Sequence, residues 1–267
     1  MRKFGVEIEM VGGSNTMRDV AARLTAEGVP TFVAGYTHAV TSQWKIVSDG
    51  SVMGQNGMEL VSPILEGDDG LAQVRKVGEV LTAMGCTVNR TTGMHVHVDA
   101  RDLTVEQIKN VLRIWCKYES NYDSILPASR RGDANMYCRS VVNRLGGTLE
   151  AAFATIKRCR TVQDLARCFN GRYYKINLEA YSRHGTLEFR GHSGTVDATK
   201  LVNWTKLVTA VVCRATETRC VKPKGAGDFT NAFRHAGGEV MRWARKRAAS
   251  FDANGRPVRT GEQSEAA

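Results

Sequence analysis

The sequence lacks any apolar run that approaches the roughly 18 residues of a membrane-spanning helix. Its start, MRKFGVEIEM, contains no hydrophobic signal region. The seven cysteines are odd in number and form no C-x-x-C pair, which argues against a disulfide framework or a zinc knuckle. We therefore expect a soluble protein with reduced thiols, located in the cytoplasm, and no membrane partner.

The composition is that of a globular chain, with 42% hydrophobic and 24% charged residues among 267, so a disordered or fibrous protein is excluded. The net charge of +10 is uneven: residues 1–100 carry −3, residues 101–218 carry +8 and residues 219–267 carry +5. This distribution suits carboxylates that bind a cation next to arginines that bind a polyanion. It suits equally a basic surface for nucleic acid, and charge alone leaves both interpretations open.

Hydrophobic periodicity predicts an α+β fold, in which a largely antiparallel sheet is backed by helices on its apolar side. Strands are predicted at 3–11, 42–48, 57–62, 86–90 and 94–100, and a hairpin joins 175–181 to 185–192 through the turn SRHG. Helical patterns occupy 17–28, 71–84, the segment after the Thr104–Gln107 capping box, two parts of 148–169, the stretch from about 196, and 229–250 with a break near 237–238.

The chain is expected to divide into three parts. Residues 1–219 form the main domain, because no linker separates their elements. Residues 220–250 are a basic helical extension that ends in RWARKRAAS, and residues 251–267 are polar and interrupted by Gly and Pro, which predicts a disordered tail.

Polar residues with metal-binding side chains alternate with apolar residues on three of these strands. Glu7 and Glu9 project from one strand face at about 7 Å spacing, and His95 and His97 repeat the pattern in G-x-H-x-H. Each pair alone is also compatible with a solvated face or a structural histidine. In LEFR, Glu188 and Arg190 again share one strand face. Such a pair is most often a simple ion pair, but three strands with the same pattern together favour a functional site.

Other polar groups are candidates for the same face. Glu59 lies on the strand before L-V-S-P, and Asp49 lies in a Gly-punctuated turn. Arg130, Arg131 and Tyr137 follow one another in a polar loop, and Lys175 occupies an alternating position of the predicted hairpin. The two arginines have guanidinium groups suited to phosphate oxygens, although a surface pair would look the same in sequence.

The ordered motifs FGVEIE, DGS, MELVSP, GMHVH, SRR with its following tyrosine, and LEFRGHSGT span residues 4 to about 195. In this order they resemble the amidoligase branch of the carboxylate–amine ligase superfamily, which includes glutamine synthetase and glutamate–cysteine ligase. No G-x-x-x-x-G-K-[ST] loop is present, so a P-loop nucleotide site is not indicated.

The resemblance implies a glutamine synthetase-like catalytic domain, with a sheet curved into a partial barrel whose inner face binds ATP and two or three divalent ions. By this likeness the metal ligands are Glu7, Glu9, Glu59, His95 and Glu188. Arg130, Arg131 and Arg190 would act on the transferred phosphoryl group, and His97, Lys175 and Arg190 would contact the nucleotide. Asp49 and Tyr137 would line the site. Only three residues precede FGVEIE, so the small N-terminal domain of glutamine synthetase is not expected.

The implied reaction begins when a substrate carboxylate attacks the γ-phosphate of ATP with Mg²⁺ or Mn²⁺ as cofactor, and an amine then displaces phosphate from the acyl phosphate to give an amide. The partners would be a small-molecule or peptide carboxylate and an amine. The sequence identifies neither substrate, nor the number of metals, nor the oligomeric state.

Two other functions stay open at this point. A metal-dependent hydrolase or nuclease would use the same histidines and carboxylates without ATP. A nucleic-acid-binding protein would use Arg242, Arg245, Lys246 and Arg247, although a basic final helix is more often a solvated face. A ligase with an acidic or nucleic-acid acceptor would combine both ideas.

Overall fold

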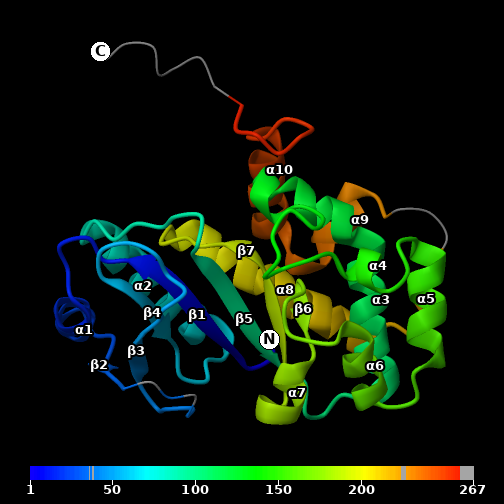
Figure 1. Ribbon diagram of the computed structural model, residues 1–267, viewed down its shortest axis with the longest axis horizontal. Coiled ribbons are helices and arrows are strands. Elements are labelled where there is room, and N and C mark those ends of the chain that lie inside the picture. Colours follow the sequence, from blue (N-terminus) through cyan, green and yellow to red (C-terminus); the bar gives the residue numbers. More distant parts are fainter. Residues whose placement is uncertain (36, 38, 224–226, 259–267) are drawn as a thin grey trace.

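A mixed sheet forms the centre of the computed structural model (Figure 1), which describes residues 1–35, 37, 39–223 and 227–258. In this part of the chain the sheet has seven strands in the order β2-β3-β4-β1-β5-β7-β6. All neighbouring strands are antiparallel except β2 and β3. The strand bounds are β1 Phe4–Val11, β2 Thr31–Val33, β3 Trp44–Ser48, β4 Gly57–Val61, β5 Gly93–Asp99, β6 Ile176–Asn177 and β7 Thr186–Ser193.

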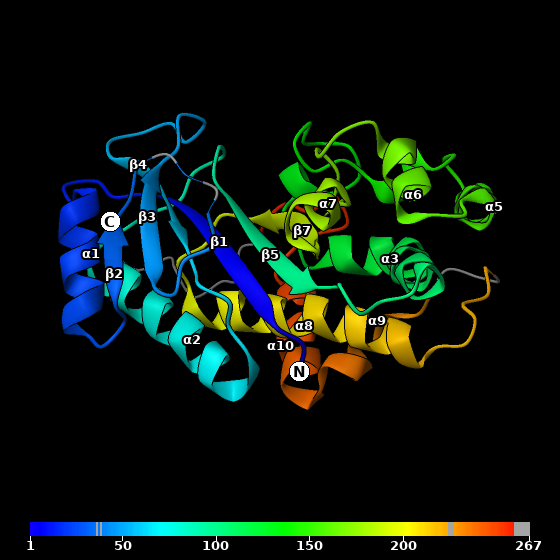
Figure 2. The ribbon, with the colours of Figure 1, turned by 90° about the horizontal axis from the view of Figure 1, so that it is seen from below.

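Helices cover one face of this sheet and extend past its β6 edge. The α-helix bounds are α1 Met17–Ala26, α2 Gly67–Ala83, α3 Val105–Ser124, α4 Val141–Arg144, α5 Leu149–Arg158, α6 Val162–Phe169, α7 Glu179–His184, α8 Ala198–Glu217, α9 Phe229–Phe233 and α10 Gly238–Ala249. Short 3₁₀ turns occur at η1 Ala128–Arg130 and η2 Arg234–Ala236. Figure 2 shows α2 and α8 along one side of the strands, while α3, α5 and α6 gather beyond β7.

The alternation in the strands separates an apolar face from a polar face. On β1 the side chains of Phe4, Val6, Ile8 and Met10 are buried in the core together with Met94, Val96 and Val98 of β5. Trp204 of α8 and Trp115 of α3 close this core, and the Trp115 ring lies 5.4 Å from the ring of Phe189 on β7. Burial of this large apolar area is the main stabilising contribution to the fold.

The predicted α+β class and the helix-backed, mostly antiparallel sheet are confirmed. The partial barrel is not: β2 and β6 are the edges of an open sheet within the described residues, so it does not close. The helix predicted after Thr104 begins with the expected capping box, in which Gln107 N donates to Thr104 Oγ1 at 3.3 Å.

Two local predictions were wrong. Residues 86–90 do not form a strand, because only Thr87 bridges to the sheet, at Val11. The hairpin partner of β7 is only two residues long, and helix α7 replaces the predicted four-residue turn. Gly185 ends α7 in the left-handed region, with φ of +67°, so the chain reverses there as a helix C-cap and not as a tight turn.

The start of the predicted disordered tail is held in place. The amide of Ala128 donates to Gly255 O at 2.8 Å, and Arg131 Nη1 donates to Ala253 O at 3.2 Å. Residues 251–258 therefore lie against the loop that contains Arg131. Residues 259–267 of the predicted tail lie outside the described residues.

The predicted helical extension packs on the main body. Phe233, Val240, Trp243 and Ala244 are buried and belong to the same hydrophobic core as the sheet. None of the helices described in the structure combines the length and the apolar character that crossing a membrane would require.

Candidate metal centre and adjoining pocket

Strand register brings the polar side chains of four strands together on the face opposite the core. Glu7 of β1 pairs with His95 of β5, and His97 of β5 pairs with Glu188 of β7. On the other side of β1, Glu9 pairs with Glu59 of β4. Paired residues of antiparallel strands project to the same side, so carboxylates and imidazoles from distant segments meet on one surface.

His95 lies at the centre of this group. Its Nδ1 is 3.2 Å from Glu7 Oε2 and 3.6 Å from Glu188 Oε1, and its Nε2 is 3.8 Å from Glu9 Oε1. His97 extends the cluster, with its Nε2 3.4 Å from Glu7 Oε1. Three carboxylates from two strands thus surround a single imidazole ring.

Ligand-type atoms converge in three overlapping groups, in each of which all atoms lie within 4.8 Å of one another. The groups share members, so they form one continuous cage. They are Glu7 with Glu59 and His95, Glu7 with His97 and Glu188, and Glu9 with Asp49 and Glu59.

Neighbouring groups fix the orientation of the cage residues. Asn177 Nδ2 donates to Glu188 Oε2 at 2.6 Å, and the amide of Gly93 donates to Glu9 Oε2 at 2.6 Å. His97 Nδ1 is 2.9 Å from Thr186 Oγ1. Such outer partners set the side-chain rotamers of metal ligands.

Gly93 has a second role at the start of β5. A Cβ atom at this position would lie 2.9 Å from His95 Nε2. The glycine of G-x-H-x-H is therefore required for close approach of the imidazole to the backbone, and a side chain there would displace His95.

A bulge in β7 places Arg190 beside the cage. The β5–β7 register shifts between Met94 and Val96, so two residues of β7, Arg190 and Gly191, lie opposite one residue of β5. Strict alternation would put His192 on the same face as Glu188, but the bulge turns it to the core, where its ring lies 5.0 Å from that of Trp204. Arg190 Nη1 pairs with Glu188 Oε1, and its buried Nε has no hydrogen-bond partner among the described residues.

The cage carries excess negative charge. Burial raises the pKa of Glu59 well above its ordinary value, and the nearby carboxylates of Glu7 and Glu9 raise it further. Burial also acts to raise the pKa of Glu7, but His97 and His95 outweigh it and hold this pKa well below its ordinary value. The pKa of His97 is raised as well, because Glu7 outweighs the effect of burial, so protons on His97 and Glu59 partly substitute for the cationic charge that a bound metal would supply.

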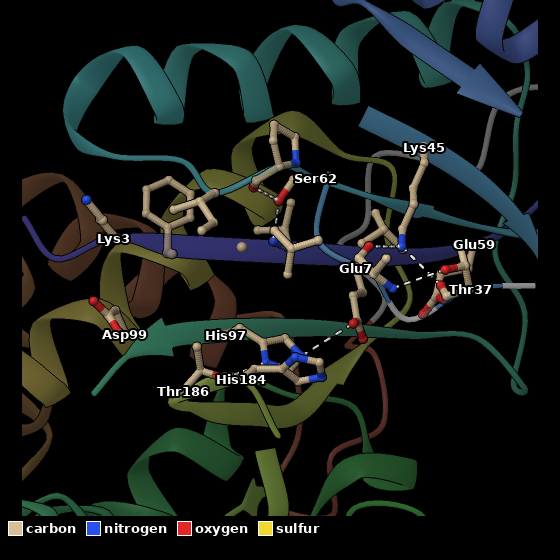
Figure 3. Close-up of a pocket in the computed structure, with 18 of the residues that line it drawn as sticks. Lys3, Glu7, Thr37, Lys45, Glu59, Ser62, His97, Asp99, His184 and Thr186 are labelled. Atoms are coloured by element: carbon tan, nitrogen blue, oxygen red, sulfur yellow. Dashed lines mark hydrogen bonds and ion pairs between the residues drawn. The ribbon is translucent and has the colours of Figure 1, made fainter. Parts of the chain in front are cut away.

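A pocket adjoins the cage on the same face (Figure 3), around the start of β1 and the end of β5. Three residues, Glu7, Glu59 and His97, belong both to the cage and to the lining of this pocket. Its walls combine apolar groups with cations: Val40, Val61, Pro63 and Ile64 with Lys3, Lys45 and Arg101.

Most of the residues that the sequence pointed to are brought together here. The predicted residues that belong to the cage or contact it are Glu7, Glu9, Asp49, Glu59, His95, His97, Glu188 and Arg190. Arg130 lies close by: it is buried and its Nη2 donates to Thr92 O at 2.6 Å, next to Gly93.

Three predicted site residues are engaged elsewhere. Arg131 Nε and Nη2 donate to the carbonyls of Leu126 and Ser124, and its Nη1 donates to that of Ala253 in the C-terminal turn. Lys175 is fully buried, and its Nζ lies 2.6 Å from Asp123 Oδ1. Tyr137 is 54% exposed, with its ring 5.5 Å from that of Tyr173.

Sequence reasoning missed Lys45 as a pocket residue and Thr186 as the partner of His97. Lys45 is two residues before Val47, which pairs with Glu59, so the alternation of β3 contained a usable signal. Thr186 had none, because its contact with His97 depends on the β5–β7 register.

A family model described as "Putative amidoligase enzyme" matches residues 1–212. The chain belongs to the amidoligase family. The match includes every residue of the cage and pocket, and it ends within α8. No curated protein matches the amidoligase sequence.

The donor set of this amidoligase fits hard divalent cations. Carboxylate oxygens predominate, each candidate group has at most one imidazole, and no cysteine takes part among the described residues. Mg²⁺ and Mn²⁺ prefer such oxygen-rich sites, whereas structural zinc sites usually include thiolates or several histidines.

Proposed function

We propose that this amidoligase is an ATP-dependent, divalent-metal-dependent carboxylate–amine ligase that forms an amide bond through an acyl phosphate. The observation that carries the proposal is the cage of three overlapping ligand groups, open to a pocket with an apolar wall and several cations. A nucleoside triphosphate needs these elements together: ions for the phosphates, cations around them and an apolar surface for the base.

Glu7, Glu9, Glu59, His95 and Glu188 would hold the ions, with Asp49 as a further ligand. When bound, Mg²⁺ or Mn²⁺ neutralises charge on the phosphate oxygens. The chain's own residues orient these ligands, and Asn177 and Gly93 hold two of the carboxylates in place.

In this proposal Arg190 would contact the transferred phosphoryl group. It lies beside Glu188, and its buried Nε is a donor without a partner in the described part of the chain. A donor already in position stabilises charge that develops during transfer without having to reorganise. Arg130, near the Glu9 end of the cage, is the second candidate for this role.

In the proposed reaction a carboxylate oxygen of the acid attacks the γ-phosphorus of ATP, and the bond to the β-phosphate oxygen breaks to release ADP. The amine nitrogen then attacks the acyl carbon. Phosphate leaves with one oxygen of the original carboxylate, and the amine gives up a proton. Activation is required because a free carboxylate resists attack by an amine.

The test is a screen of ADP release with amino acids, polyamines and peptides in the presence of Mg²⁺ or Mn²⁺. Once a substrate pair is found, an ¹⁸O-labelled carboxylate should yield labelled phosphate. Turnover without ATP would favour the metal-dependent hydrolase instead, and absence of ADP with every pair would contradict the proposal.

Neighbouring arginines give this assay an internal control. Arg130→Met should lower kcat about 10²- to 10³-fold, the effect typical of a lost charge-stabilising donor. Arg131→Met should leave kcat within about threefold in protein that is folded, because Arg131 donates to backbone carbonyls at the end of α3 and in the C-terminal turn. Equal losses in both variants would contradict the assignment of Arg130.

A further inference from the structure

Lys45 of β3 is a buried cation in the pocket wall. The residue is 3% exposed, and its Nζ donates to the carbonyls of Thr37 at 3.0 Å and Ala39 at 2.6 Å. Within the part of the chain that the structure describes, no carboxylate oxygen lies within 4.0 Å of this ammonium group. The other lysines that are buried in the described chain, Lys109 and Lys175, have carboxylate partners.

A buried ammonium group with only carbonyl partners is electrostatically incomplete. Carbonyl dipoles satisfy its hydrogens but do not cancel its charge, and removing a cation from water is costly unless an anion accompanies it. The acidic residues of the same pocket, Glu7 and Glu59, do not fill this role in the proposed enzyme, because they bind metal there. The counter-charge is therefore expected from a ligand.

We propose that Lys45 binds a phosphate group of the nucleotide and thereby makes the pocket selective for a polyphosphate over the bare nucleoside. The proposal rests on the proposed ligase function and adds a nucleotide contact that the shared motifs do not include. Lys45 lines the pocket that Glu7 and Glu59 also line, so an ion held by these carboxylates would bring phosphate oxygens to the same end of the pocket (Figure 3).

Phosphate suits this position better than a substrate carboxylate. Lys45 and Glu7 both pair with Val61, and the pocket residues Pro63 and Ile64 follow Val61 toward Leu65, the partner of Phe4, and so lead away from the cage. A nucleotide would place its phosphates at the charged end and its base along the apolar wall. A small amino acid would leave the apolar wall uncovered.

The experiment compares binding of a non-hydrolysable ATP analogue and of adenosine to the full chain with Mg²⁺, by calorimetry. Lys45→Met should weaken binding of the analogue about 10- to 100-fold, as expected for loss of a charged hydrogen bond. Adenosine affinity should change less than about twofold. Lys45→Arg should retain most of the affinity for the analogue, and Lys76→Met, which removes an outlying cation paired with Glu27, should behave as wild type.

The outcomes separate the alternatives. Equal weakening of the binding of both ligands would overturn the proposal. It would show that Lys45 has only a structural role, in holding the segment at Thr37 and Ala39. Unchanged analogue affinity with a raised KM for the carboxylate substrate would assign the lysine to that substrate instead, and would also overturn it. Wild-type protein that binds no analogue would defeat the ligase function as well, whereas tight wild-type binding that Lys45→Met leaves intact would defeat only this inference.

Discussion

Glu59 lies directly opposite Glu9 on the neighbouring strand, and Asp49 completes a group of three carboxylates. Like charges in direct cross-strand register repel each other. Without metal, repulsion among these carboxylates therefore destabilises the fold when Glu59 is ionised, and the raised pKa of Glu59 reflects burial together with this repulsion. In the proposed enzyme, a bound cation would relieve this repulsion.

The first prediction concerns Glu59→Gln in metal-free protein. The folded pKa of Glu59 lies above the ordinary value of 4.5, so the ionised residue opposes folding, and wild-type stability falls as pH rises above 4.5 through the folded pKa. Near pH 7 the glutamine variant should be more stable by about 1 kcal/mol or more. Urea unfolding at several pH values measures this difference, and a difference that does not change with pH would contradict the prediction.

At the level of elements, side chains of helix α3 contact both the loop after Arg130 and the edge of the sheet at β6. Asp123 accepts from the amide of Gly132 at 2.7 Å, and Glu119 accepts from the amides of Val141 and Val142, each at 2.9 Å. The two carboxylates thus hold both ends of the segment that follows Arg130. Lys175, next to β6, lies between them with its charge fully buried.

The second prediction is that Lys175→Met lowers the free energy of unfolding by about 3–5 kcal/mol, because it leaves two buried carboxylates without their cation. Lys76→Met is the matched control, since its pair with Glu27 is half-exposed and screened by water, so its loss should change stability far less. Urea denaturation of both variants provides the measurement. Similar losses in the two would show that the buried network is not a stabilising element.

A double variant separates charge from shape in the same network. Adding Asp123→Asn to Lys175→Met removes one of the uncompensated carboxylates, so the double variant should lose less than the sum of the single losses. Strict additivity would indicate that Lys175 stabilises the fold through packing alone.

On the scale of the whole molecule, the core and the cage lie on opposite faces of one sheet. The core side chains are packed between the sheet and the helices, and none of them belongs to the cage. Metal binding should therefore add stability to a chain that is already folded, unlike the case of a small zinc domain.

The third prediction follows from mass action. Mn²⁺ at 100 times its Kd should raise the free energy of unfolding by about 2.7 kcal/mol for a single site. Glu188→Ala should abolish most of this gain, while metal-free wild-type protein should keep its helical circular dichroism after chelation. Thermal unfolding across a metal titration measures both effects. Collapse of the fold on chelation would contradict this view of the molecule.

Alternation along the chain was enough to predict the two faces of the strands and most of the cage. Alternation fixes which side a strand residue takes, so Glu7, Glu9, His95, His97 and Glu188 could be assigned to one face before any pairing was known. Capping residues such as Thr104 likewise set helix starts locally. These features depend on neighbours within a few positions of the chain.

Tertiary structure alone decided which cations face the site. Arg130 and Arg131 are adjacent in sequence, yet one lies by the cage and the other binds the C-terminal turn, because residues 251–258 fold back onto their loop. Lys175 shares a strand pattern with Asn177 but is paired with α3, while Lys45 faces the pocket. Long side chains bind the acceptors that lie nearest, whether carbonyls or carboxylates, and which acceptors are nearest depends on segments that are far apart in sequence.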